Sequence, residues 1–208
     1  MSTDIVIPVL LLVVAFLYAS VGHGGASGYI AVLTLFSIPL QIYKPVVLVL
    51  NSIIAGIAFI QFYRAGYFKR KLAWPFLLTS VPCAFIGSQV KTSEHIYNLI
   101  LGIALLFPIV RLLMNGPKEK TQAQQLTMLP ALIWGAAIGL ASGFLNIGGG
   151  IFLSPVIILM GWGNTKDAAA VSSLFIVFNS LSGLAGAGIQ TSSFTTNSFI
   201  WIGAAVIG

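Results

Sequence analysis

The sequence predicts an all-α integral membrane protein, a polytopic helical bundle of two inverted repeats with Gly-rich broken helices. Of its 208 residues, 58% are hydrophobic and 7% are charged, whereas a soluble protein carries about 25% charged residues. The mean hydropathy is +1.01, so lipid must surround most of the chain. Two further observations are long stretches without charge and a Gly-rich pattern that occurs once in each half.

Stretches without Asp, Glu, Lys or Arg define the predicted helices. A membrane-spanning helix needs about 20 apolar residues. The shorter stretches each accommodate one helix, and a longer one, such as residues 5–43, needs two passes or one pass and a broken piece. We therefore predict nine apolar segments, at Ile5–Val21, Ala26–Tyr43, Pro45–Tyr63, Leu72–Val90, Ile96–Met114, Leu126–Leu145, Ile147–Trp162, Ala168–Ala187 and Phe199–Gly208.

Basic residues predict the side of the membrane on which each loop lies. The loops after the third and fifth segments carry Arg64, Lys69, Arg70, Lys71, Arg111, Lys118 and Lys120. If every segment spans, these loops share one side with Lys166, and the positive-inside rule makes that side cytoplasmic. Lys44 and Lys91 then lie outside. The chain is thus predicted to be a multi-pass membrane protein with its N-terminus outside.

The second half of the sequence repeats features of the first. Gly148 follows Gly24 by 124 positions, and three further pairs at an offset of 122 are Lys44 with Lys166, Asn51 with Ser173, and Gly66 with Gly188. Five predicted crossings lie between the start of the first segment and the start of the sixth. Because five is an odd number, the second repeat begins on the opposite side of the membrane and is inverted relative to the first. The residues after Gly66 are basic and those after Gly188 are neutral, which fits opposite sides of the membrane. Inverted repeats are a recurrent design of secondary transporters.

The repeat divides the chain into three parts. Residues 1–115 form repeat 1 with about five apolar segments, 116–125 form a cytoplasmic linker, and 126–208 form repeat 2 with about four segments, the last incomplete. Gly208 corresponds to about Gly87, after which repeat 1 continues through another helix. The chain therefore looks truncated at its C-terminus, and we expect a fragment rather than a protein that lacks this helix.

The Gly clusters predict two broken helices, at Gly22–Ser27 and Asn146–Gly150. Glycine costs about 1 kcal/mol relative to alanine inside a helix and opens backbone angles that other residues avoid. A break exposes N–H groups of the next helix, which bind anions well. Close helix packing also favours small residues, so the clusters predict either packing alone or packing together with a substrate site, and their duplication favours the second.

Polar residues in and beside the breaks are the candidate ligands of an anion. The predicted substrate-binding residues are Gly22, His23, Gly24, Gly25, Ser27, Asn51, Asn146, Gly148, Gly149, Gly150, Ser172, Ser173 and Asn179. Serine and asparagine also hydrogen bond between membrane helices without a further role. His23 titrates near neutral pH in its ordinary state, so it fits a proton relay as well as a structural role.

Missing motifs exclude several other functions. No acidic residue lies inside an apolar segment, and no cluster of His, Cys and acids indicates a metal site or a catalytic nucleophile. No phosphate-binding loop of the GxxxxGK[ST] type occurs. We therefore predict no enzyme activity, no catalytic residue, no metal and no cofactor. The net charge of +6 is explained by membrane topology rather than by nucleic-acid binding.

The two Gly motifs resemble those of the TauE/SafE family of sulfite and organosulfonate exporters. The resemblance rests on Val21–Gly25, Asn146–Gly150, Lys166–Leu174 and Tyr63–Gly66 and covers nearly the whole chain. It implies a bacterial-type inner-membrane carrier for small sulfur-containing or carboxylate anions. The chain departs from the family pattern by stopping early, and by having Lys44–Val47 where the second half has an Ala-rich helix.

Three functions are compatible with these features. The leading hypothesis is a secondary transporter, an exporter, that moves a small anion such as sulfite, a sulfonate or a related carboxylate by alternating access. An anion channel would use the same lining, and a non-transporting membrane subunit would dock a partner protein instead. A coupling ion, H⁺ or Na⁺, and assembly into a homo-oligomer both remain open.

Overall fold

The computed structural model describes residues 3–114, 124–188, 194 and 196–208, and within them the chain forms helices and no strands. The helices are α1 (Thr3–Ser20), α2 (Ala26–Leu35), α3 (Leu40–Arg64), α4 (Arg70–Ser88), α5 (Glu94–Met114), α6 (Met128–Leu145), α7 (Gly150–Leu159), α8 (Thr165–Ala187) and α9 (Thr196–Ile207). Each matches one predicted apolar segment. The linker 116–125, with Lys118 and Lys120, lies almost entirely outside the described residues.

The helices have the composition and length of a polytopic membrane protein, as predicted. In the described part of the chain, Tyr43–Arg64, Met128–Leu145 and Thr165–Ala187 are long and apolar enough to cross a membrane. Leu, Ile, Val and Phe side chains stand exposed on the outer faces of most helices, for example Phe16, Leu78, Ile103 and Leu129. In water such surface would be costly, whereas in a bilayer it contacts lipid.

Among the described residues, the helices α2 and α7, which match the second and seventh predicted segments, are too short to cross the membrane. α2 and α7 have ten residues each, which gives about 15 Å against a hydrocarbon core of about 30 Å. The assumption that every segment spans is therefore wrong for Ala26–Tyr43 and Ile147–Trp162. The second segment in fact ends at Leu35, and its last residues belong to α3, because a left-handed turn at Ser37 ends the helix.

The backbone of the first half recurs in the second. Eight of the left-handed residues described form pairs at matching places, namely Gly22 with Asn146, Gly25 with Gly149, Ser37 with Gly161, and Gly66 with Gly188, whereas Gly148 has no left-handed counterpart at Gly24. The turns also match, since the hydrogen bond from His23 N to Tyr18 O recurs from Ile147 N to Ser142 O. Both half-helices begin directly after a left-handed glycine. These matches support the internal repeat predicted from the sequence.

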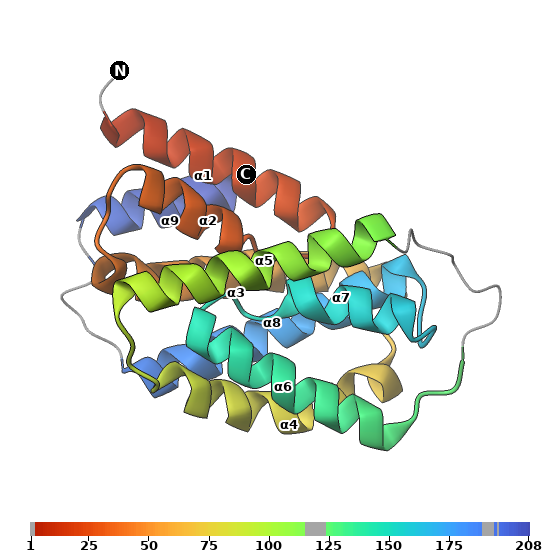
Figure 1. Cartoon of the computed structure of the whole chain (residues 1–208). Coiled ribbons are helices and arrows are strands. Elements are labelled where there is room, and N and C mark those ends of the chain that lie inside the picture. Colours follow the sequence, from red (N-terminus) through yellow and green to blue (C-terminus); the bar gives the residue numbers. More distant parts are fainter. Residues whose placement is uncertain (1–2, 115–123, 189–193, 195) are drawn as a thin grey trace.

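The two halves run in opposite directions (Figure 1). In that view α1 and α3 advance from left to right and α2 returns towards the left, whereas α6 and α8 advance from right to left and α7 returns towards the right. The α3–α4 and α7–α8 loops therefore lie at the same end of the molecule, which we call the basic end. The start of α1 lies at the opposite end. The α3–α4 and α7–α8 loops therefore share one end and the N-terminus lies at the other, as in the predicted arrangement, although α2 and α7 do not cross.

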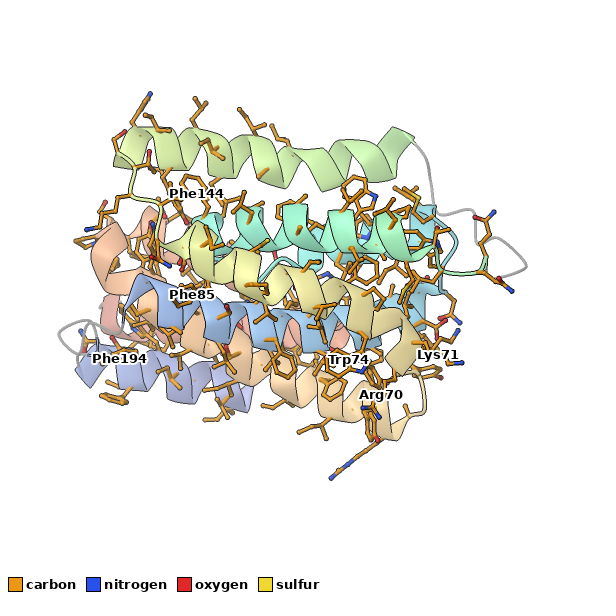
Figure 2. All side chains as sticks on the ribbon, turned by 90° about the horizontal axis from the view of Figure 1, so that it is seen from below. Arg70, Lys71, Trp74, Phe85, Phe144 and Phe194 are labelled. Carbon is orange, nitrogen blue, oxygen red and sulfur yellow. The ribbon has the colours of Figure 1, made fainter. Side chains whose placement is uncertain are left out.

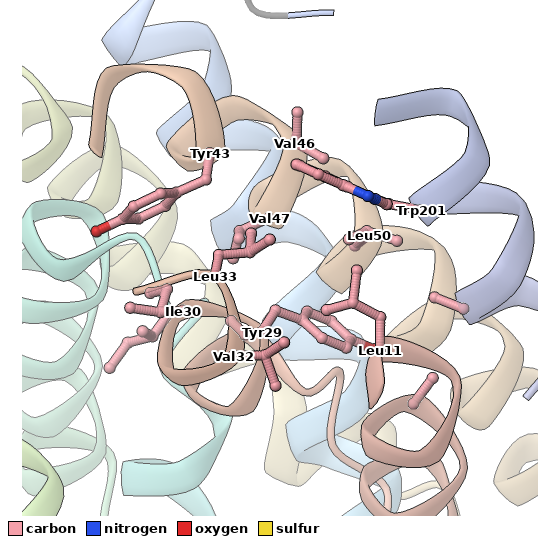
Figure 3. Packing of buried hydrophobic residues seen from close by; sticks show 14 of the residues in the cluster. Leu11, Tyr29, Ile30, Val32, Leu33, Tyr43, Val46, Val47, Leu50 and Trp201 are labelled. Atoms are coloured by element: carbon pink, nitrogen blue, oxygen red, sulfur yellow. The ribbon is translucent and has the colours of Figure 1, made fainter. Parts of the chain in front are cut away.

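Two hydrophobic cores hold the helices together, and each mixes both repeats. The first joins α1, α2, α3, α5 and α9 to the last residue of α6 and to the second break, with Leu11, Tyr29, Leu50 and Trp201 packed closely (Figure 3). The second joins α4, α6, α7 and α8. The half-helix α2 thus belongs to the first core and α7 to the second. The fourth helix of repeat 1, α4, packs in the second core, and the fourth helix of repeat 2, α9, packs in the first. The predicted boundaries, 1–115 and 126–208, describe the sequence repeat rather than these packing units.

Glycines bring α4 and α6 into direct backbone contact. Gly135, Gly139 and Gly143 occupy one face of α6, and a Cβ on any of them would collide with the backbone of α4. The two helices lie side by side in Figure 2. Small residues spaced by four are a general device for close approach of membrane helices. The residues at offset 124 on α1 are Leu11, Ala15 and Ala19, so the glycine stripe belongs to α6 alone.

Candidate functional site

The first break, residues 21–25, separates α1 from α2. Gly22 and Gly25 have φ values of 78° and 91°, which favour glycine because a Cβ is strained there. Gly25 is the N-cap of α2 and supplies no side chain to the free N–H groups of the first turn. The side chain that accepts from this turn therefore comes from elsewhere in the chain.

The second break, residues 146–149, separates α6 from α7 in the same way. Asn146, Gly148 and Gly149 all have positive φ, at 57°, 70° and 78°. Asparagine tolerates the left-handed conformation better than other non-glycine residues, which explains Asn146 where the first break has Gly22. Gly149 is the N-cap of α7, again without a side-chain hydrogen bond. Residues 145–150 are all buried.

Asn51 joins the two breaks. It lies on α3 with 1% of its surface exposed. Its Oδ1 accepts from the N–H of Ala26, the first residue of α2, at 3.1 Å. Its Nδ2 donates to the Ile147 carbonyl in the second break at 3.5 Å and to Ser180 Oγ on α8 at 2.8 Å. One amide therefore caps a half-helix of repeat 1 and contacts the broken backbone of repeat 2.

His23 makes a second connection across the repeats. Its Nδ1 lies 3.1 Å from the Val21 carbonyl, and its ring also contacts the backbone of Gly150, the first residue of α7. Its Nε2 is 3.5 Å from Ser154 Oγ, which donates to Ser172 Oγ on α8 at 2.8 Å. A residue of the first break thus contacts the first turns of α7, and Ser154 connects it to Ser172 on α8.

The glycines of both breaks are also packing residues. A Cβ on Gly22 would collide with Ala169 of α8, and one on Gly24 or Gly148 would collide with the Asn51 side chain. Gly149 and Gly150 are equally close to Phe175 and Ile176 of α8. Close packing is therefore present at every predicted break glycine named here, and binding through their backbone stays a prediction.

The remaining predicted residues are less central. Ser27, half-buried, shares a hydrogen bond of 3.0 Å with Tyr18 OH. Ser173 donates to the Ala170 carbonyl of its own helix. Asn179 is turned towards α4, where Nδ2 donates to Ser80 Oγ at 3.0 Å. The structure therefore brings His23, Asn51, Ser172 and the glycines together but places Asn179 in a different helix interface.

Asn146 combines a strained backbone with an unmatched acceptor. Its Nδ2 donates to the Phe144 carbonyl at 3.1 Å, and its Oδ1 is buried without a hydrogen-bond partner among the described residues. Buried polar atoms normally have partners. An unpaired oxygen beside a break is compatible with a bound water or ligand.

Ser154 was not among the predicted site residues, although its position in the sequence could have indicated it. Ser154 lies four residues after Gly150 and is the single polar residue between Gly150 and Leu159. A helical turn places it on the same face as the start of α7. Tyr97 was also missed, because its hydroxyl donates to the Leu145 carbonyl at 2.6 Å from a helix distant in the sequence.

Matching lysines of the two repeats contact tyrosines at opposite ends of the molecule. Lys44 Nζ lies 4.2 Å from the centre of the Tyr97 ring. Lys166 Nζ lies 4.8 Å from the centre of the Tyr67 ring and donates to its hydroxyl at 3.0 Å. At the basic end Lys69 also pairs with the buried Asp167 at 2.5 Å, so charged contacts join the α3–α4 loop to the start of α8.

The arrangement presents two helix N-termini to the centre of the bundle. N-terminal N–H groups carry partial positive charge and favour anions, and the serine, histidine and asparagine side chains nearby supply further polar groups. No group of three or more His, Cys, Asp or Glu residues able to hold a metal occurs in the described residues. Binding of an oxyanion at this centre stays a prediction.

Comparison with known proteins agrees with this architecture. A family model described as "Sulfite exporter TauE/SafE" matches residues 7–208. A protein of Sinorhizobium fredii (strain NBRC 101917 / NGR234), named "Probable membrane transporter protein y4hK", is 34% identical over 179 residues, which cover 84% of this chain and 72% of that protein. No solved structure matches the chain significantly. The family predicted from the Gly motifs is confirmed, and the chain belongs to the TauE/SafE family of membrane transporters.

Proposed function

We propose that the chain is a secondary transporter that exports a small anion, such as sulfite, a sulfonate or a related carboxylate, by alternating access. It would do so in the inner membrane with its N-terminus outside, coupled to H⁺ or Na⁺ or driven by the anion gradient alone. The family description names sulfite export, and the helix N-termini at the centre suit that anion chemistry.

The observation that carries the proposal is the meeting of the two breaks. Half-helices α2 and α7 begin near the middle of the bundle, and Asn51 and His23 connect the break of one repeat to that of the other. Discontinuous helices whose N-termini face an anionic substrate near the midplane are a known transporter design. The two mixed cores would be the bodies that rock against each other around this site.

Burial of the second break favours a carrier over a channel. Residues 145–150 are buried, as are Ser172, Ser173 and Asn51. A carrier passes through conformations in which its site is closed to both sides, whereas an open pore needs a wet lining. A subunit that only docks a partner would need no polar connection between the breaks.

Flux measurements in proteoliposomes test the proposal. We expect the purified chain to carry labelled sulfite, a sulfonate or a small carboxylate with saturable kinetics. The changes His23→Ala and Ser154→Ala should each lower this flux by about tenfold or more, because each removes a polar group at the start of α7. Ser52→Ala is the matched control, since its hydroxyl donates only to Leu48 O of its own helix.

Three outcomes distinguish the alternatives. Single-channel currents in place of saturable flux would establish a channel. Folded protein that moves none of these anions would exclude the transporter and favour a docking subunit. If Ser52→Ala and Ser154→Ala lower the flux equally, the transported anion does not depend on the proposed site.

A further inference from the structure

Two apolar grooves flank a ridge on the outer surface of α4. The ridge is formed by Trp74 and Leu78, one helical turn apart, whose exposed fractions are 54% and 67%. Both residues line both grooves. The groove towards α6 has a volume of about 920 Å³ and includes Pro75, Leu126, Met128, Leu132 and Trp162. The groove towards α8 has a volume of about 580 Å³ and includes Ala73, Leu77, Val81, Pro82, Leu174 and Phe178.

At the basic end both grooves are lined by cations, and none of the described residues that line them is acidic. Arg70 lines the groove towards α8, and Lys69 and Lys71 line the groove towards α6. Arg70, Lys71 and Trp74 lie together at one end of α4 (Figure 2). Because Lys69 already pairs with Asp167, Arg70 and Lys71, both exposed, are the cations best placed to meet a ligand.

The dimensions of the grooves match one leaflet of a bilayer. From Arg70 to Pro82 the helix rises by about 18 Å, while one leaflet of the hydrocarbon core is about 15 Å thick. Trp74 lies about one helical turn from Arg70 at the basic end, and tryptophans are enriched at the membrane interface. A ligand that fits this surface has a negative group at the basic end and two apolar chains that extend towards the midplane.

We propose that this surface of α4 binds an anionic phospholipid. Its phosphate is held by Arg70 and Lys71, and one acyl chain lies in each groove, on either side of the Trp74–Leu78 ridge. Basic clusters next to membrane helices attract anionic lipids electrostatically, and the paired grooves add a specific fit that charge alone does not give. The site is separate from the breaks, because neither groove includes a residue of the predicted substrate site.

Lipid titration of the purified full chain, followed by native mass spectrometry, tests the headgroup. Phosphatidylglycerol should bind more tightly than phosphatidylcholine with the same acyl chains. Each basic residue near a membrane surface contributes about a fivefold gain in affinity for anionic lipid, so Arg70→Gln with Lys71→Gln should weaken phosphatidylglycerol binding by about 25-fold. Arg64→Gln removes a cation from the last residue of α3, at the same end of the molecule but outside both grooves, and should have little effect. Equal binding of the two lipids, or an unaffected double variant, would overturn the proposal.

Two further measurements test the acyl chains. Leu78→Ser should weaken binding, whereas Leu129→Ser, an equally exposed leucine at 69% that lines neither groove, should not. In a Trp162→Phe background, which removes the second tryptophan of the groove towards α6, phosphatidylglycerol brominated on its acyl chains should quench tryptophan fluorescence, and much less when Trp74→Phe is added. This measurement keeps Arg70 and Lys71, so it tests the proposal even if the double variant fails to fold. If glycerol phosphate binds as tightly as the lipid, the site is a phosphate site and the lipid proposal is wrong.

Discussion

Asn51 shows how a single side chain can define the centre of this molecule. All three of its hydrogen bonds go to groups distant in the sequence, the Ala26 N–H, the Ile147 carbonyl and the Ser180 hydroxyl. In the absence of water, a buried polar group without a partner is expensive. Asn51 therefore stabilises both breaks at once, and any contact with substrate would have to replace one of these bonds.

Replacing Asn51 with leucine should destabilise the protein strongly. The change leaves an N–H, a carbonyl and a hydroxyl without their partner in a buried site, and we expect a loss of about 2–4 kcal/mol in the free energy of unfolding. Denaturation in mixed detergent micelles measures it. Ser52→Ala at the next position removes a hydroxyl that bonds within its own helix and should cost less than about 1 kcal/mol. Equal losses of unfolding free energy for the two changes would show that the hydrogen bonds of Asn51 to the two breaks do not contribute more to stability than a hydrogen bond within one helix.

Local signals in the sequence predicted the helices and the places where they break. The Gly clusters marked both breaks because the left-handed backbone at Gly22, Gly25 and Gly149 favours glycine. The length of α2 and α7 was not predicted, because an apolar segment looks the same whether it crosses the bilayer or stops halfway. The partners of Asn51 and His23 in the second repeat were not predicted either, since these contacts span 96 to 131 positions and depend on how the two repeats pack.

Among the helix pairs, α4 and α6 depend most directly on glycine. A Cβ at Gly139 would lie within 2.4–2.8 Å of Ser80 backbone atoms, so even Gly139→Ala has to push two helices apart. Overpacking of this kind costs about 1–3 kcal/mol, which should appear as a lower melting temperature of the purified protein. Gly102→Ala on α5 meets nothing within 4 Å and should leave the melting temperature unchanged or slightly raised. A tolerated Gly139→Ala would mean that α4 and α6 are not held at their present distance.

At the scale of the whole molecule, the two repeats form two mixed cores. α3 and α8 contact each other between the cores, and Asn51 and Ser180 meet at that contact. Exchange of the fourth helix ties each half-helix to helices of both repeats, so a movement of one core carries a half-helix with it. Such a movement would change the access to both breaks together, which is what alternating access requires.

The inversion itself predicts that the ends of α2 and α7 emerge on opposite sides of the membrane. Pro39 lies at the end of the α2–α3 connection and Met160 at the end of α7, and both are exposed. In a background carrying Cys83→Ser, a membrane-impermeant maleimide should label Pro39→Cys in intact cells and Met160→Cys only in inside-out vesicles. Gln124→Cys is the matched control, because the Gln124 N–H donates to the Gly161 carbonyl at 2.7 Å and must share the side of Met160. Labelling of Pro39→Cys and Met160→Cys from the same side would mean parallel repeats, and the two half-helices could then not approach one central site from opposite sides of the membrane.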